Sequence, residues 1–441
     1  MSVIRLVSRT KLYWGLIAIF LIGVVWSPVT SSGRNIFLSS GNLLDVLRQV
    51  STTGLIATGM TAVIITGGID LSVGSLMAIC TVVCAMLLTV PGETPAFLLG
   101  VPSVMLAALV IGVAVTRFIF SNLEKSRTDL THGRDLTLDR IRGIYLPALV
   151  GIALGIVLLF YIVPQSETKF GVLGVLVVVP AVGLLFGAMN GIIIVVGRLQ
   201  PFIVTLAMMV TALGIARLTA GQNNAVLPVY TGSNATADFD VLRSLVFGII
   251  PMPGIFFIVA ISIYAVVLKY TPFGRFVYAI GGNEEAARLS GIDSGRVKIV
   301  TYAVSGLLAG IAAILYVAQY RQGKPDAGAG LELDAIAAVV IGGTSLMGGR
   351  GSLAGTFCGV LIFGLLSNIL QLHNINSNLQ LVLKGLIIIG TVLVQERNAR
   401  DILARLRLAL PRPARSEASR EERPRKETMS LNTGGNGNET S

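Results

Sequence analysis

Residues 273–298 read FGRFVYAIGGNEEAARLSGIDSGRVK, a polar interruption between two long apolar runs. The middle of this stretch predicts a short surface helix, because Asn283 can cap its N-terminus. Glu284 and Glu285 place acidic side chains in the first turn, and Gly291 can end the helix. A helix this short is marginal alone in water, so we expect it to dock against something. The alternative is an ordinary solvated loop between two membrane spans.

The composition places the chain among membrane proteins. Of its 441 residues, 53% are apolar and 13% are charged, and the mean hydropathy is +0.79. Fifty glycines in such a chain indicate close helix packing and broken helices rather than flexible linkers. The formal charge of +11 does not by itself indicate nucleic-acid binding, because Lys and Arg of membrane proteins collect in cytoplasmic loops.

The fold class that we predict is all-α, a polytopic integral membrane helical bundle of about twelve segments. The apolar run from Leu12 follows basic residues and lacks a small-residue cleavage site, so it predicts an uncleaved first helix. The segment 334–346 is too short to span regularly and is expected to belong to a broken helix. The expected segments are 12–30, 48–66, 74–90, 96–119, 144–164, 171–197, 201–219, 246–269, 298–319, 334–346, 353–371 and 378–395.

Basic residues sort to one side of this arrangement. With the N-terminus inside, the segments placed inside hold most of the loop Lys and Arg: 120–143, 198–200, 270–297 and the C-terminal tail. The opposing loops are poor in both, apart from 320–333, which carries Arg321 and Lys324. The bias predicts a multi-pass membrane protein with both termini in the cytoplasm.

We expect two regions along the chain. Residues 1–396 form a transmembrane domain, and residues 397–441 form a cytoplasmic tail that is first basic and amphipathic, then disordered.

Two glycine-rich stretches interrupt apolar runs in the two halves of the chain. Gly67 to Ser75 reads GGIDLSVGS, in which the glycine pair frees the backbone and Asp70 and Ser72 can cap the next helix. Helices broken in this way often line a transport path, so both capping and substrate contact stay open for Asp70. Gly343 to Gly355, GTSLMGGRGSLAG, echoes the same pattern.

Polar side chains inside the spans are expected to face the bundle interior, a cavity or an interface. Lys384 lies deepest and has Asp334 as a possible partner. The other such residues are Asn190, Asn368 and Gln200. A polar cluster at the outer end of the span beginning near Ile299 suits hydroxyl-rich ligands, a docked protein or mutual salt bridges: Gln319, Tyr320, Arg321, Lys324, Asp326, Glu332 and Asp334.

The sequence lacks the motifs of several chemical functions. It contains no GxxxxGK[ST], HExxH or GxSxG, and its histidines, His132 and His373, fall on opposite predicted sides of the membrane. The cysteines suggest neither a disulfide framework nor a zinc site and are expected to be buried: Cys80, Cys84 and Cys358. We therefore expect no enzyme activity, no metal and no cofactor bound by this chain.

Four motifs resemble the permease subunits of bacterial ribose-type sugar ABC importers, a group that includes xylose, arabinose, galactose and autoinducer-2 permeases. They are GMTAVIITGGIDLSVGSLMA, GRLQPFIVTLAMM, GRFVYAIGGNEEAARLSGID and ELDAIAAVVIGGTSLMGGRGSLAGT. The resemblance covers about 45–90 and 180–395. It implies a dimer, either a homodimer or a pair with a sister permease, in the membrane lipid. A separate cytoplasmic ATPase would use the ATP, and a periplasmic sugar-binding protein would deliver the sugar.

The resemblance also implies roles for individual residues. Glu285-Ala286-Ala287 with Gly291 is similar to the EAA loop that seats in the ATPase. The coupling loop would comprise Gly282, Asn283, Glu284, Glu285, Ala286, Ala287, Arg288 and Gly291. The translocation path would be flanked by Gly67, Gly68, Asp70, Ser72, Asn190, Asp334, Gly342 and Gly343.

The chain departs from this pattern in three places. Residues 91–170 are expected to be an insertion of two crossings with a charged cytoplasmic loop, and the basic tail follows residue 396. The EAA loop of other importer families often continues to I-x-L-P, which is absent here, so the coupling geometry is transferred by analogy.

We therefore expect a permease subunit of an ATP-binding-cassette importer that moves a monosaccharide or related polyol into the cytoplasm. The alternative is an ion-coupled secondary solute transporter, which would need a membrane carboxylate such as Asp70 or Asp334. A membrane receptor or scaffold is a third class, disfavoured by the glycine-broken spans.

Overall fold

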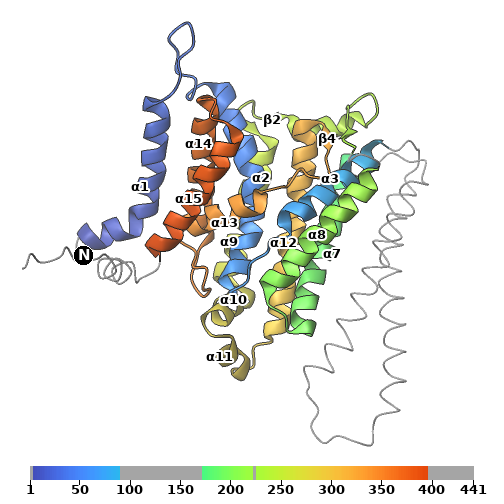
Figure 1. Cartoon of the computed structure of the whole chain (residues 1–441), viewed down its shortest axis with the longest axis vertical. Coiled ribbons are helices and arrows are strands. Elements are labelled where there is room, and N and C mark those ends of the chain that lie inside the picture. Colours follow the sequence, from blue (N-terminus) through green and yellow to red (C-terminus); the bar gives the residue numbers. More distant parts are fainter. Residues whose placement is uncertain (1–2, 90–170, 222–224, 396–441) are drawn as a thin grey trace, which may run out of the picture. The chain divides into compact units, whose positions relative to one another are not determined.

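The computed structural model describes residues 3–89, 171–221 and 225–395 (Figure 1). Two expected spans, 96–119 and 144–164, lie outside the described residues, as do the expected insertion at 91–170 and the tail at 397–441. The α-helices are α1 (Val3–Val25), α2 (Ser40–Ile65), α3 (Val73–Thr89), α7 (Val172–Gly197), α8 (Pro201–Ala220), α9 (Met252–Tyr270), α10 (Pro272–Gly282), α11 (Glu284–Leu289), α12 (Ser294–Tyr320), α13 (Leu331–Ile341), α14 (Leu353–Leu372) and α15 (Ser377–Gln395). The shorter elements are the 3₁₀ helix η3 (Ala237–Arg243) and the strands β1 (Leu227–Pro228), β2 (Leu245–Val246), β3 (Ile250–Pro251) and β4 (Gln322–Gly323).

The all-α membrane fold is confirmed, since every expected span within the described residues contains a helix. Five described helices are long and apolar enough to cross a membrane, namely α7, α8, α9, α12 and α14. The segment 334–346 corresponds to α13, whose 11 residues cover only roughly 16 Å of a bilayer core about 30 Å thick. The chain is a multi-pass membrane protein.

Several expected boundaries were wrong: α1 ends at Val25 instead of residue 30, and α2 begins at Ser40 instead of residue 48. The span at 246–269 begins with the antiparallel pair β2–β3, and its helix α9 starts only at Met252. Pro251 occupies the N-cap position, and Pro253 lies in the first turn, where a missing N–H costs no helical hydrogen bond. The sequence was apolar throughout, so hydropathy alone placed the start too early.

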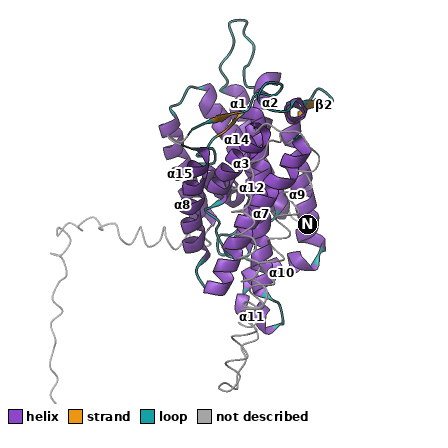
Figure 2. Cartoon of the chain, turned by 90° about the vertical axis from the view of Figure 1, so that its right-hand side faces the viewer, coloured by secondary structure: helices purple, strands orange, loops and turns teal. Residues whose placement is uncertain are grey.

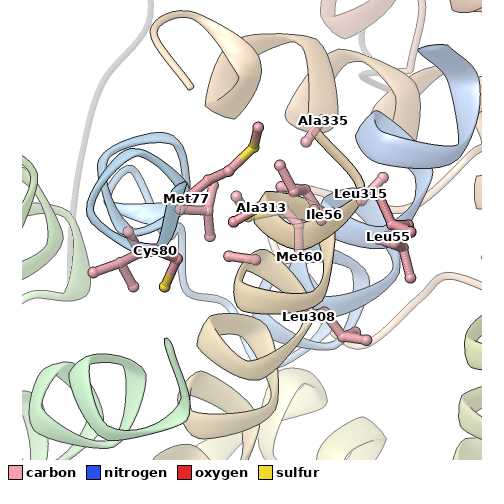
Figure 3. Close-up of a cluster of buried hydrophobic side chains, with 14 of the residues drawn as sticks. Leu55, Ile56, Met60, Met77, Cys80, Leu308, Ala313, Leu315 and Ala335 are labelled. Carbon is pink, nitrogen blue, oxygen red and sulfur yellow. The ribbon is translucent and has the colours of Figure 1, made fainter. Parts of the chain in front are cut away.

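Helix α12 lies at the centre of the bundle and packs against α2, α3 and α7. Figure 3 shows the apolar core that results, with Leu55 and Met60 from α2, Met77 from α3, and Leu308 and Leu315 from α12. The three cysteines are free and buried, as predicted.

Glycines bring α7 and α12 close together. A Cβ on Gly187 would lie 3.1 Å from the Cα of Gly306, and a Cβ on Gly191 would lie 2.6 Å from the Cα of Ile299. Small residues at such positions let two helix backbones approach, which is how helices associate tightly inside a membrane. The prediction that glycines serve close helix packing is confirmed on this pair.

The two ends of the bundle carry different structures (Figures 1 and 2). At one end β1 pairs antiparallel with β4, which joins the polar loop after α8 to the segment after α12. At the opposite end lie α10 and α11, the helices of the polar stretch 273–298.

Candidate functional site

Helix α11 has the caps that the sequence predicts. The Asn283 side chain accepts a hydrogen bond from the Ala286 N–H at 2.9 Å. At the other end Gly291 has a φ of +83°, and its N–H donates to the Arg288 carbonyl at 3.0 Å. The N–H of Ile292 donates to the Ala287 carbonyl at 3.1 Å. This pair of bonds is the Schellman arrangement, in which glycine takes the left-handed position at no steric cost.

The faces of α11 differ in what they contact. Ala287 is buried against the bundle, and Glu284 forms an ion pair with Lys298 of α12 at 2.6 Å. Glu285 pairs with Arg288 at 2.8 Å on the solvent side. Leu289 is 79% exposed. The helix is therefore attached along one side and presents a partly apolar surface along the other.

Helix α10, which directly precedes α11, was not predicted from the sequence, where a helix was expected only in the middle of the stretch 273–298. Pro272 stands in its first turn, and its buried residues are Gly274, Val277 and Ile280. Their spacing of three is the available signal, because it places them on one face of a helix. The polar stretch thus contains two consecutive helices.

The first glycine-broken segment follows α2. Gly67 has a φ of +79°; its N–H donates to the Ile64 carbonyl at 2.9 Å, and the Gly68 N–H donates to the Val63 carbonyl at 3.0 Å. This is again a Schellman ending. The chain then turns through Asp70 and restarts as α3 at Val73, as predicted.

The second glycine-broken segment, after α13, repeats this ending. Gly343 has a φ of +88° and donates to the Val340 carbonyl at 2.8 Å, while the Thr344 N–H donates to the Val339 carbonyl at 3.2 Å. Helix α14 restarts at Leu353, with the Ser352 side chain accepting from the Gly355 N–H at 3.1 Å. Gly342 packs against Gly355, since a Cβ on Gly342 would lie 2.5 Å from the Gly355 carbonyl carbon. The repeat seen in the sequence is therefore a repeat of backbone structure.

Asp70 is fully buried and holds a polar network, the Asp70 node. Its Oδ1 accepts the Ser72 N–H at 3.0 Å and the Ser72 hydroxyl at 2.6 Å, and its Oδ2 accepts the Ser305 hydroxyl at 3.1 Å. Asn190 Nδ2 donates to Ser72 Oγ at 2.8 Å. The node connects the turn before α3 with α7 and α12. Asp70 therefore caps the turn before α3 and also connects this turn to α12.

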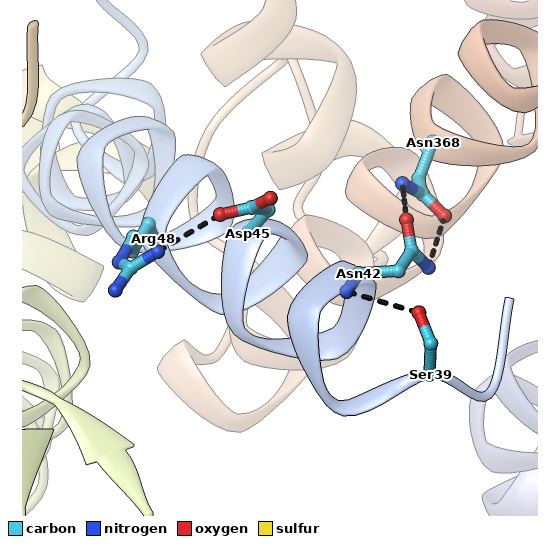
Figure 4. Close-up of polar contacts among 5 residues, drawn as sticks. All are labelled: Ser39, Asn42, Asp45, Arg48 and Asn368. Atoms are coloured by element: carbon cyan, nitrogen blue, oxygen red, sulfur yellow. Dashed lines mark hydrogen bonds and ion pairs between the residues drawn. The ribbon is translucent and has the colours of Figure 1, made fainter. Parts of the chain in front are cut away.

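The other candidate path carboxylate makes its contacts elsewhere. Lys384 Nζ of α15 lies 3.0 Å and 2.8 Å from the two carboxylate oxygens of Asp334 and 5.3 Å from the centre of the Phe363 ring. The pairing named as an alternative for Lys384 is thus present. Asn368 is also paired, in a reciprocal amide contact with Asn42 at 2.7 Å and 3.1 Å (Figure 4).

The outer polar cluster is held partly by internal contacts. Lys324 and Asp326 form an ion pair at 3.2 Å, and the rings of Tyr316 and Tyr320 lie 4.5 Å apart. The Thr81 hydroxyl donates to the Lys324 carbonyl at 2.9 Å, which attaches this segment to α3.

Of the residues expected to flank the path, the structure brings five to one place: Gly67, Gly68, Asp70, Ser72 and Asn190. Gly342 and Gly343 lie at the C-terminal end of α13. Asp334 lies in the first turn of α13, where it contacts Lys384 of α15. Sequence reasoning missed Ser305, the partner of Asp70 in α12. A hydroxyl on an otherwise apolar span was the only signal for it.

Known proteins match most of the chain. The family described as branched-chain amino acid transport system / permease component matches residues 42–127 and 143–392. The ribose import permease protein RbsC of Escherichia coli K12 is 35% identical over 369 residues, covering 82% of this chain and 87% of that protein. The galactofuranose transporter permease protein YtfT of the same organism is 30% identical over 388 residues, or 87% and 89% of the two chains. The xylose transport system permease protein XylH of Escherichia coli K12 is 30% identical over 368 residues, covering 81% of this chain and 85% of that protein. No solved structure matches the chain.

Proposed function

Because this chain belongs to the branched-chain amino acid transport system / permease component family, and within it to the ribose-type sugar ABC permeases, we propose that it imports a monosaccharide or a related polyol. It is the membrane-spanning subunit of an ATP-binding-cassette importer in the bacterial inner membrane, with both termini in the cytoplasm. The similar permeases for ribose, galactofuranose and xylose support a sugar as the solute.

The observation that carries the proposal is helix α11. It is capped at both ends, attached to the bundle through Ala287 and the Glu284–Lys298 pair, and open to a partner through Leu289 and Glu285. A six-residue helix cannot hold its shape in water without such support. A cytoplasmic ATPase that grips this helix can move the elements attached to it, and Gly291 keeps the helix short enough to seat as one unit.

In this mechanism the chain supplies a path and two conformations, and it breaks no covalent bond of the solute. ATP binds and is hydrolysed in the partner ATPase, and this chain itself holds no cofactor. A periplasmic sugar-binding protein docks at the end of the β1–β4 pair and releases its sugar into a cavity formed with a second permease copy or a sister permease. The glycine-broken segments at Gly67–Ser75 and Gly342–Gly351 flank that path.

Two contacts favour this function over ion-coupled transport. A secondary transporter needs a membrane carboxylate that can release and bind a proton or sodium. Asp70 is bonded to Ser72 and Ser305, and Asp334 is paired with Lys384. The partners of both carboxylates therefore explain their presence inside the bundle without a role in ion binding.

Residues 1–396 make up the transporting domain in this proposal. The expected insertion at 91–170 lies within this domain, whereas the tail at 397–441 lies outside it, and uptake does not require the tail.

Reconstitution tests the proposal. The chain is placed in proteoliposomes with a two-P-loop ATPase and a sugar-binding protein from its own organism, and uptake of labelled ribose and xylose is measured. We expect uptake that requires ATP and persists when ionophores remove proton and sodium gradients. Uptake without ATP that ionophores abolish would contradict the proposal and support an ion-coupled transporter.

A further inference from the structure

Three segments far apart in the sequence meet at glycine backbones near α11. They are the end of α2 at Ile65 and Gly67, the end of α10 at Gly281 and Gly282, and the turn between α13 and α14 at Gly348 and Gly349. We name the glycines of this meeting point, Gly67, Gly281, Gly282, Gly348 and Gly349, the glycine junction.

Direct backbone contacts hold the junction together. The Gly349 N–H donates to the Ile65 carbonyl at 2.8 Å. A Cβ on Gly281 would overlap that same carbonyl oxygen and lie 2.5 Å from the Gly349 nitrogen. A Cβ on Gly348 would lie 2.9 Å from the Gly281 carbonyl oxygen and 3.0 Å from the Gly67 nitrogen. The three segments therefore touch without any side chain between them.

A side chain adds a second attachment on the same face of α10. The Tyr278 hydroxyl donates to the Gly351 carbonyl at 2.9 Å. Because Tyr278 precedes Gly281 by three residues, the two contacts lie on one side of the helix. Helix α10 is thus attached twice to the turn between α13 and α14.

This connection differs from the one between α11 and α12. The Glu284–Lys298 pair joins two flexible side chains, and the Glu284 side chain is 48% exposed. Such a pair can follow a displacement by changing rotamers. Backbones in contact have no rotamers to change, and packed elements move between discrete arrangements more readily than they deform.

We propose that the glycine junction transmits movement of α10 and α11 to both glycine-broken segments together, and that Gly281 and Tyr278 are positioning residues for transport. This inference rests on the proposed function. In this inference the ATPase grips α11, and residues outside α11 transmit the movement to the segments beside the solute path.

A glycine outside both the coupling loop and the junction offers a control variant. Gly281→Ala inserts a methyl group into the junction, whereas a Cβ on Gly214 in α8 meets nothing within 4 Å. In the reconstituted complex, we expect Gly281→Ala to lower the sugar transported per ATP hydrolysed by about fivefold or more. Gly214→Ala should keep the wild-type ratio. Co-purification of the ATPase with each variant reports whether the variant folds and docks. A purely structural defect would lower the amount of ATPase that co-purifies, whereas a transmission defect would lower the ratio of sugar transported to ATP hydrolysed.

Tyr278→Phe keeps the test valid if Gly281→Ala does not fold. It removes one hydroxyl at a half-buried site, and we expect it to lower the same ratio by about threefold with the ATPase still bound. The wild-type ratio in Tyr278→Phe and in any Gly281→Ala protein that folds would overturn the inference. An equal loss in Gly214→Ala would also overturn it. A wild-type complex without ATP-dependent uptake would overturn the proposed function itself.

Discussion

Asp70 shows how a single buried carboxyl group can organise several helices. Its carboxylate has no exposed surface and receives hydrogen bonds from Ser72 and Ser305. A polar group buried in this way is costly unless it is hydrogen-bonded. Through Asn190 the Asp70 node also reaches α7. These bonds make Asp70 a structural residue of the bundle, whatever it contacts during transport.

Replacing Asp70 by Ala leaves the buried donors of Ser72 and Ser305 without an acceptor. We expect the folded protein to lose about 1–3 kcal/mol of stability, measured as a lower temperature at which detergent-solubilised protein loses its monodisperse form. Asp70→Asn retains an acceptor oxygen and should lose less. As a control, Asp326→Ala removes an exposed ion pair and should change stability by no more than about 0.5 kcal/mol. Equal melting of Asp70→Ala and wild type would contradict this account.

The Asp334–Lys384 pair predicts a different pattern. Both side chains are 19% exposed, so Lys384→Ala leaves a mostly buried carboxylate without its partner. We expect a loss of roughly 2 kcal/mol. Adding Asp334→Asn should restore part of that stability, because the second change removes the unpaired charge. A double variant no more stable than Lys384→Ala would show that the pair is not coupled.

At the scale of elements, local signals were sufficient for some helix ends, although not for the starts of α2 and α9. The caps of α11 follow directly from Asn283 and Gly291, and the glycine pairs at Gly67 and Gly343 predict where α2 and α13 end. Each of these depends on residues within one turn. Helix α10 was missed because its eleven residues show one short amphipathic face inside a polar stretch.

Contacts between distant segments could not be predicted in the same way. The glycine junction joins Ile65, Gly281 and Gly349, whose meeting depends on how α2, α10 and α13 pack. Likewise, Ser305 looks like an ordinary core residue of an apolar span until it is placed beside Asp70. The candidate residues were therefore predictable one at a time, and their grouping required the fold.

The exposed face of α11 predicts how the ATPase binds. Leu289→Asp should not disturb the bundle, because this side chain is 79% exposed. We expect it to weaken association with the ATPase about tenfold, measured by titration of the ATPase onto the permease in nanodiscs. Phe247→Asp makes the same kind of change in the β2–β3 turn, where the side chain is 93% exposed, and should leave the affinity unchanged. Equal effects of the two variants would contradict docking at α11.

At the scale of the whole molecule, charge and structure agree on two distinct ends of the bundle. The segment with α10 and α11 belongs to the side that the Lys and Arg distribution places in the cytoplasm. The β1–β4 pair and the polar loop after α8 lie at the other end (Figure 1). An importer needs this arrangement, since the motor acts from inside and the solute arrives from outside.

Thiol labelling at α11 can test that arrangement, because the native cysteines Cys80, Cys84 and Cys358 are all buried. Ala286, exposed on α11, is replaced by Cys. A membrane-impermeant maleimide is then applied to intact cells with a permeable outer membrane and to inside-out vesicles. We predict that Ala286→Cys reacts only in the vesicles, and that bound ATPase protects it there. Reaction from outside the cells would place α11 beyond reach of any cytoplasmic ATPase and contradict the importer account.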